Sequence, residues 1–213
     1  MTAVVTPPSV EERSVTRPPR RRMSRVGSAV LGIALAAAAV GAQHFVLDYN
    51  ERTTPLTYTG TMGEAVDTGR FSARALSVKA ARSVEVPQPG SYRRIEGDPV
   101  FILVETSATS AREPMKLTAD LLTTDGKVYR KTDKVDITWT LEFKWIQPGW
   151  WASGMYVFEV PAEALPGASI VVRLPTASET YVPEAEIDLG LDEASANALV
   201  SGAQETYRLG NKS

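Results

Sequence analysis

Beyond the first third of the chain, apolar residues recur at every second position, the spacing of β-strands whose side chains alternate between two faces. In the segment 100–109, both sets of alternate positions are apolar at first, as in Phe101 and Ile102. One set becomes polar towards the end, as in Glu105 and Ser107. We therefore predict a strand that is buried on both faces where it begins and half-exposed where it ends.

The dipeptide Asp125-Gly126 separates two segments of strand composition, 116–122 and 127–132. Asp-Gly supplies the positive φ angles that a tight turn between antiparallel strands requires. The sequence predicts a β-hairpin here.

Every odd position from 135 to 145 is apolar, and the residues between are mostly polar. The six are Val135, Ile137, Trp139, Leu141, Phe143 and Trp145. This alternation predicts one strand with a buried face, which places Trp139 and Trp145 together in the core.

Further strands are predicted over 71–78, 155–160, 169–174 and 186–189, because these apolar segments lie between Gly or Pro turn signals. About seven short strands with turns between them favour an all-β sandwich over 63–191. In the remaining segment, 192–213, Asp192 is placed to cap a short helix over 193–201 that Gly202 ends, followed by a tail.

The N-terminal part has a different pattern. Residues 1–25 are rich in Pro, Arg, Ser and Thr and predict a disordered tail. Residues 26–47 are mostly apolar and uncharged, about 33 Å long as a helix against a bilayer core of about 30 Å. We therefore predict a transmembrane helix that contacts lipid, followed by a polar, Thr-rich linker over 48–62.

A basic cluster precedes the predicted helix and determines its orientation, because short basic flanks stay in the cytoplasm. Its members are Arg20, Arg21, Arg22 and Arg25. A single-pass membrane protein with a cytoplasmic N-terminus and an extracytoplasmic domain follows. The alternative is a cleaved secretory signal, because Val40-Gly41-Ala42 has the small residues of a peptidase site and Gln43 would then begin a secreted domain.

Composition excludes several kinds of chemistry. The chain has no cysteine, which removes disulfides, lipid attachment through a lipobox and zinc-thiolate sites. The formal net charge is -2, made up of +4 on residues 1–25 and -6 on the remainder, so nucleic-acid binding by the folded part is not expected. His44 is the one histidine, at the predicted membrane edge without partners, and we predict no metal site, no cofactor and no catalytic residue.

Carboxylate pairs are the remaining route to an enzyme, and this reading ranks third among the functions considered. The candidates for such a pair are Asp67, Asp98, Asp120, Asp133, Asp136 and Glu142.

All four tryptophans fall between positions 139 and 151. Trp150 and Trp151 are adjacent, and neighbouring side chains on an extended chain point in opposite directions. At least one of the two is therefore expected at the surface or at an edge. An exposed tryptophan there suits a protein partner, a wall sugar or the bilayer interface.

Several segments together resemble a family of uncharacterised immunoglobulin-like domains in membrane-anchored proteins and lipoproteins of Gram-positive bacteria. They are PVFILVETSATSAREPMKL, LLTTDGKVY, IQPGWWASGMYVFEVPAEALPGASIVVRL and AEIDLGL, within about Thr61 to Leu191. The sequence departs from the family at Ser110, where Asn is frequent, and in its Trp-rich stretch. The resemblance implies an immunoglobulin-like fold and no particular activity.

These patterns favour a non-enzymatic, membrane-anchored interaction module that presents a β-sandwich to a protein partner of the cell envelope. The alternative is a binder of a small or polysaccharide ligand through Trp150 and Trp151.

Overall fold

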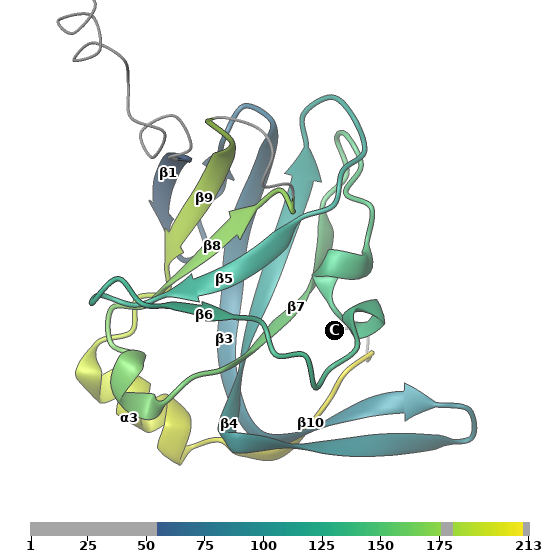
Figure 1. The fold of residues 1–213 in the computed structure, drawn as a ribbon, viewed down its shortest axis with the longest axis vertical. Helices are drawn as coiled ribbons and strands as arrows, with labels where there is room; N and C mark the ends of the chain where they lie inside the picture. Colours follow the sequence, from purple (N-terminus) through teal and green to yellow (C-terminus); the bar gives the residue numbers. More distant parts are fainter. Residues whose placement is uncertain (1–54, 176–180, 211–213) are drawn as a thin grey trace, which may run out of the picture. The chain divides into compact units, whose positions relative to one another are not determined.

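The computed structural model describes residues 55–175 and 181–210, which form two packed β-sheets and one short α-helix (Figure 1). The strands are β1 Leu56–Thr61, β2 Val66–Asp67, β3 Phe71–Gln88, β4 Ser91–Ser110, β5 Thr118–Leu122, β6 Val128–Arg130, β7 Ala152–Glu159, β8 Ser169–Arg173, β9 Pro183–Asp188 and β10 Gln204–Arg208. The helices are α3 Glu193–Ser201 and the 3₁₀ turns η1 Ile137–Trp139, η2 Leu141–Phe143 and η3 Ala162–Ala164.

Sheet A has the strand order β1-β9-β8-β5-β6, and sheet B has the order β10-β3-β4-β7 with β2 also paired to β3. The outer pairs β1 with β9 and β10 with β3 are parallel, and the other pairs are antiparallel. The predicted β-sandwich is confirmed, but the described residues contain ten strands instead of about seven.

The inner faces of the two sheets make the main core, which includes Ile102 and Tyr156 from sheet B and Ile170 and Ile187 from sheet A. A second apolar cluster covers the outer face of sheet B, where Phe101 and Leu103 pack with Val135, Val157 and Leu209. The segment 100–104 of β4 is therefore buried on both faces, as its doubly apolar sequence predicts.

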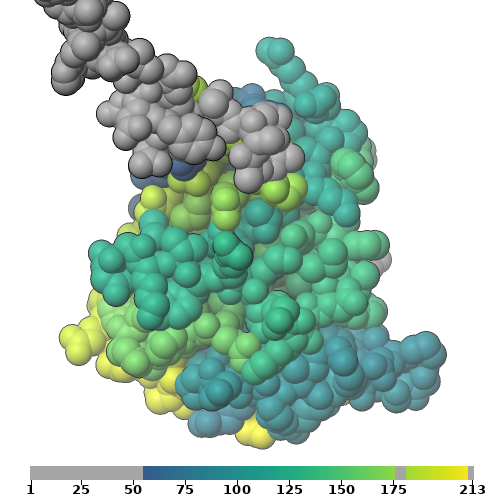
Figure 2. Space-filling model, viewed as in Figure 1, coloured from purple at the N-terminus to yellow at the C-terminus, as the bar shows by residue number. Residues whose placement is uncertain are grey.

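β3 and β4 form a long hairpin. The sequence pattern predicts its strands only over 71–78 and 100–109, and it does not predict the far part of the hairpin between them. Its register shifts at Ala75/Ser77 and at Ala81/Ser83, and its far part projects from the body of the domain (Figure 2). This far part carries β10, so the predicted tail after α3 is partly a strand.

Several local predictions are confirmed. Gly126 has φ 79° in the turn between β5 and β6. Asp192 caps α3 through a hydrogen bond from the Ser195 backbone N–H, and Gly202 is the C-cap.

Two predictions are wrong. The predicted linker 48–62 contains β1, whose residues are exposed except for Gly60 and so lack the alternation of a half-buried strand. The segment 135–145 forms η1 and η2 instead of a strand, because the Asp136 carboxylate accepts a hydrogen bond from Thr138 N and starts a tight turn.

Candidate functional site

One end of the sandwich gathers the loops that carry most of the tryptophans. In sheet A, Leu56 at the start of β1 pairs with Pro183 at the start of β9, and Arg173 at the end of β8 pairs with Thr118 at the start of β5. The end of β4 and the start of β7 lie at this same end, because the loop 111–117 joins β4 directly to β5. We call it the entry end, since the described chain enters the domain here (Figure 1).

The loop 143–151 is fastened to the entry end by main-chain hydrogen bonds. Met115 and Ile146 exchange two of them, at 3.0 and 2.8 Å, and Ser110 N donates to Gln147 O at 3.3 Å. Ile146 is fully buried, so the adjacent Trp145 points away from the core. The predicted burial of Trp145 is therefore wrong.

Four aromatic side chains of this loop are exposed, and we call them the aromatic surface: Phe143, Trp145, Trp150 and Trp151. Trp150 is 77% exposed and Trp145 60%, the two highest values among large apolar side chains of the described residues. The predicted exposure of at least one member of the Trp150-Trp151 pair is confirmed for both. Exposed apolar side chains gathered in this way make the surface a candidate for contact with a partner, a ligand or a membrane.

Cations accompany these rings. Lys116 Nζ lies 5.3 Å from the Phe143 ring centre and 5.6 Å from that of Trp145, and the Arg74 guanidinium lies 4.5 Å from the centre of Trp151. These are cation–π distances. Sequence reasoning missed both cations, because only the pairing of distant segments brings them to the tryptophans.

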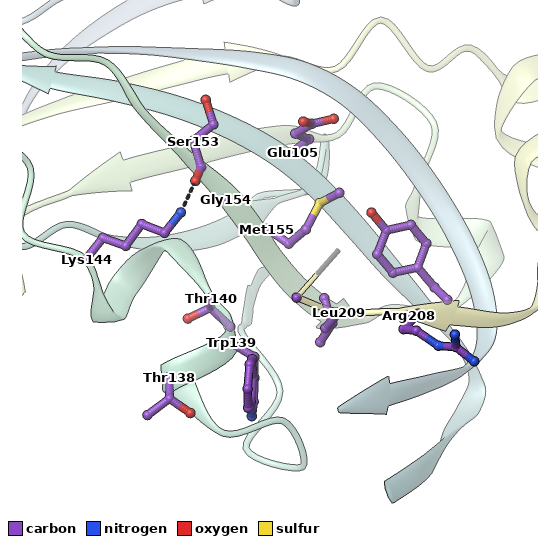
Figure 3. A pocket seen from close by; sticks show the side chains of 12 residues that line it. Glu105, Thr138, Trp139, Thr140, Lys144, Ser153, Gly154, Met155, Arg208 and Leu209 are labelled. Atoms are coloured by element: carbon purple, nitrogen blue, oxygen red, sulfur yellow. Dashed lines mark hydrogen bonds between the residues drawn. The ribbon is translucent and has the colours of Figure 1, made fainter. Parts of the chain in front are cut away.

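A hollow of about 470 Å³ lies on the outer face of sheet B, where η1, β4, β7 and β10 meet. Figure 3 shows Met155 in its middle, with Glu105, Lys144 and Trp139 around it. Trp139 is half-buried here on the second cluster, instead of in the core between the sheets.

The polar groups of the hollow are held in place by neighbours. Lys144 Nζ donates to the Ser153 carbonyl at 2.5 Å, and Ser77 Oγ donates to Glu105 Oε2 at 2.8 Å. The hollow thus has an apolar floor and a rim with charges of both signs.

Four of the six predicted carboxylate candidates have separate structural partners. Asp120 pairs with Arg173, and Glu142 pairs with Lys131. Asp67 accepts from Gly69 N at 2.9 Å, and the hydrogen bond from Thr138 N to Asp136 holds the pKa of Asp136 below its usual value. Within residues 55–175 and 181–210, no cluster of three or more His, Cys, Asp or Glu side chains is arranged to hold a metal ion.

The predicted topology determinants Arg20, Arg21, Arg22 and Arg25 lie outside the described residues, as do 1–25, the span 26–47, the cleavage position and His44. The part of the chain that the structure describes contains no helix with the length and apolar character of a membrane span.

No family model and no curated protein matches the sequence. Two solved structures are similar. One is an uncharacterized β-sandwich protein of Clostridium difficile 630, with 11% identity and a TM-score of 0.37 over 62% of this chain and 95% of that one. The other is MPT63, a secreted protein of Mycobacterium tuberculosis, with 18% identity and a TM-score of 0.42 over 62% of this chain and 98% of that one. Both similarities are distant, and no activity of this chain follows from them.

Proposed function

We propose that the chain is a non-enzymatic, membrane-anchored module that presents an immunoglobulin-like β-sandwich outside the cell to a protein partner of the envelope. The anchor is residues 26–47, with the basic cluster before it in the cytoplasm. The family resemblance supports the immunoglobulin-like assignment, through the Asp125-Gly126 hairpin and the strand around Phe158.

The observation that carries the proposal is the hollow on the outer face of sheet B. Its apolar floor of Met155 and Leu209 lies beside the Trp139 ring, and Glu105 and Lys144 supply opposite charges at the rim. Binding hot spots are pockets of this kind, in which an apolar side chain of the partner is buried and polar rim groups orient it.

Site-specific photo-crosslinking in the full-length protein, expressed in its own membrane, tests the proposal. A photoreactive residue at Thr138, which is exposed at the rim, should capture one protein identified by mass spectrometry. The same residue at Val128, 55% exposed on edge strand β6, should not capture it. Ser153→Trp, which fills the hollow, should weaken binding of that purified partner at least about tenfold, as loss of a hot-spot contact does.

The alternative is a polysaccharide ligand on Trp150 and Trp151, which is favoured by the exposed ring of Trp150. Soluble envelope glycan should then quench tryptophan emission, and Trp150→Ala with Trp151→Ala should abolish the effect. Capture of no protein at Thr138, or equal capture at Val128, contradicts the leading proposal.

A further inference from the structure

The aromatic surface differs from the hollow in composition and in place. On the sheet B side of the entry end, the segments 67–74, 110–117 and 143–151 contain five basic residues and two carboxylates, Asp67 and Glu113. The same segments carry the two most exposed tryptophans, Trp145 at 60% and Trp150 at 77%. Exposed tryptophan beside an excess of Lys and Arg is the combination found where proteins meet the headgroups of a bilayer.

The path of the chain points to the same surface. β1 begins at Leu56 at the entry end, and the predicted membrane span ends at residue 47. The eight residues between them reach at most about 28 Å when fully extended. A chain anchored through 26–47 therefore keeps Leu56, at the entry end, within about 28 Å of the end of the span.

We propose that the aromatic surface rests in the headgroup region of the anionic membrane that holds the anchor. Trp145 and Trp150 insert their rings at the interface, and Arg112 and Lys116 contact lipid phosphates. The entry end then faces the membrane, while the hollow on the outer face of sheet B opens sideways to the envelope. This inference rests on the anchor in the proposed function and adds a second, lipid-binding surface to it.

Tryptophan emission offers a direct test, because all four tryptophans lie between 139 and 151 and the anchor contains none. Trp139→Phe leaves only the three tryptophans of the aromatic surface. The full-length variant is reconstituted in phosphatidylcholine–phosphatidylglycerol vesicles whose phosphatidylcholine carries bromine at acyl carbons 6 and 7, or at carbons 11 and 12. We expect about a twofold loss of emission with the shallow bromine and less with the deep one, as for rings at the interface.

Charge reversal separates specific contact from mere tethering. Arg112→Glu with Lys116→Glu should remove most of the quenching in the anionic vesicles. Lys127→Glu is the matched control, because Lys127 lies in the hairpin after β5, at the end of the sandwich opposite the entry end. Undiminished emission with both brominated lipids overturns the inference, and so does equal quenching in the double variant.

Quenching and the carbonate wash together distinguish a failure of the lipid contact from a failure of the membrane anchor in the proposed function. If emission is unquenched while the chain stays in the vesicles after an alkaline carbonate wash, the anchor stands and the lipid contact is wrong. A photoreactive residue at Trp150 that captures one protein in cells would then assign this surface to a protein partner. If the chain leaves the vesicles in the wash, the anchor itself is wrong and the inference falls with it.

Discussion

At the scale of single residues, Tyr156 joins the two sheets through one hydrogen bond of its side chain. It is fully buried in β7, and its hydroxyl donates to the Leu117 carbonyl at 3.1 Å, just before β5. Tyr156→Phe leaves that buried carbonyl without its partner. We expect the variant to lower the free energy of unfolding by about 1 kcal/mol at pH 7, measured by urea denaturation.

The same residue predicts a pH effect. Burial raises the pKa of Tyr156 above its usual value of 10.0. At neutral pH, folded and unfolded chains both hold the neutral phenol, so its titration does not affect stability. Above pH of about 10 the unfolded chain ionises first, which favours unfolding. The stability difference between wild type and Tyr156→Phe should therefore shrink as the pH rises from 9 to 11, and a constant difference over that range would contradict the burial argument.

Gly154 allows the segment with η1 and η2 to lie against β7. A Cβ atom at this position would lie 3.0 Å from the backbone N and Cα atoms of Leu141, which is fully buried. Gly154→Ala should therefore destabilise the domain by about 1 to 3 kcal/mol in urea denaturation, as overpacking does. Ser153→Ala, on the neighbouring exposed residue, is the control and should change stability by less than about 0.5 kcal/mol.

The tryptophans show how far residue-level prediction reaches. The exposure of at least one of Trp150 and Trp151 follows from their adjacency, because neighbouring side chains on an extended chain point in opposite directions, and the structure exposes both. The exposure of Trp145 does not follow, because its alternating pattern is that of a strand and only the pairing of Ile146 with Met115 shows which residue faces inward. Long-range pairing of this kind leaves no local signal in the sequence.

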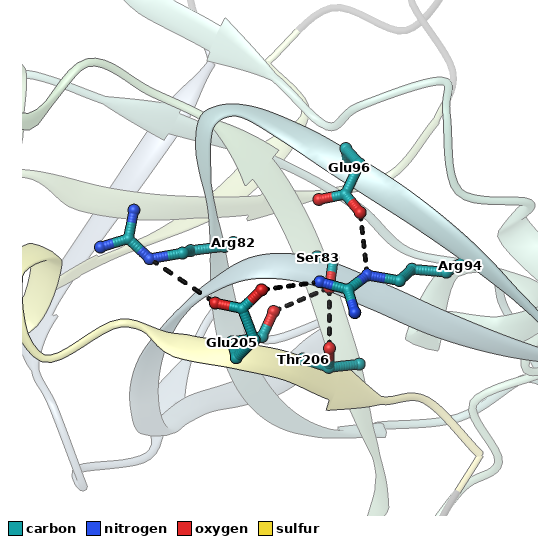
Figure 4. A network of polar contacts seen from close by, with 6 residues as sticks. All are labelled: Arg82, Ser83, Arg94, Glu96, Glu205 and Thr206. Atoms are coloured by element: carbon teal, nitrogen blue, oxygen red, sulfur yellow. Dashed lines mark hydrogen bonds and ion pairs between the residues drawn. The ribbon is translucent and has the colours of Figure 1, made fainter.

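At the scale of elements, β10 shows which contacts hold an edge strand. The fully buried Ser83 hydroxyl donates to the Glu205 carbonyl at 2.7 Å and lies 2.9 Å from Thr206 Oγ1 (Figure 4). Arg82 and Glu205 are paired at 4.0 Å, but both side chains are more than half exposed. Buried hydrogen bonds stabilise by about 1 to 2 kcal/mol, whereas exposed ion pairs contribute about 0 to 1 kcal/mol.

We therefore expect Ser83→Ala to loosen β10 and Arg82→Ala to leave it nearly unchanged. Amide hydrogen exchange over 204–208 should become about fivefold to thirtyfold faster in Ser83→Ala, the factor that corresponds to 1 to 2 kcal/mol. Equal exchange rates in the two variants would mean that other contacts hold this strand.

Strands with a continuous run of buried residues are the ones that the sequence pattern predicts well. β5, β7 and β8 each pack apolar residues on the main core and lie where the pattern places them. β1 and β10 are parallel edge strands with mostly exposed residues, so their sequences resemble loops. The opposite error occurs at 135–145, where the spacing is that of a strand but a capping aspartate and 3₁₀ turns determine the backbone.

At the scale of the whole molecule, the two faces of sheet B have different roles. The inner face closes the main core, and the outer face carries the second cluster and the hollow. The apolar composition of β4 predicts that both of its faces are buried. It does not predict that the residues packed on the outer face come from the segments around η1 and β10. The sequence therefore predicts that other residues pack on the outer face of sheet B, but it does not predict the hollow that forms between them.

Whether the module stays at the membrane depends on the cleavage position after Ala42. We predict that the anchor is retained, because the apolar run continues through Phe45, Val46 and Leu47 beyond the cleavage position. Intact mass should then include the residues before Gln43, and the chain should remain in the membrane fraction after an alkaline carbonate wash. Ala42→Tyr removes the small residue that a signal peptidase requires. If the anchor is retained in the wild type, this variant should also keep the residues before Gln43 and stay in the membrane fraction. A wild-type chain that begins at Gln43 and is released, beside a variant that stays in the membrane, would show instead that the same β-sandwich is secreted.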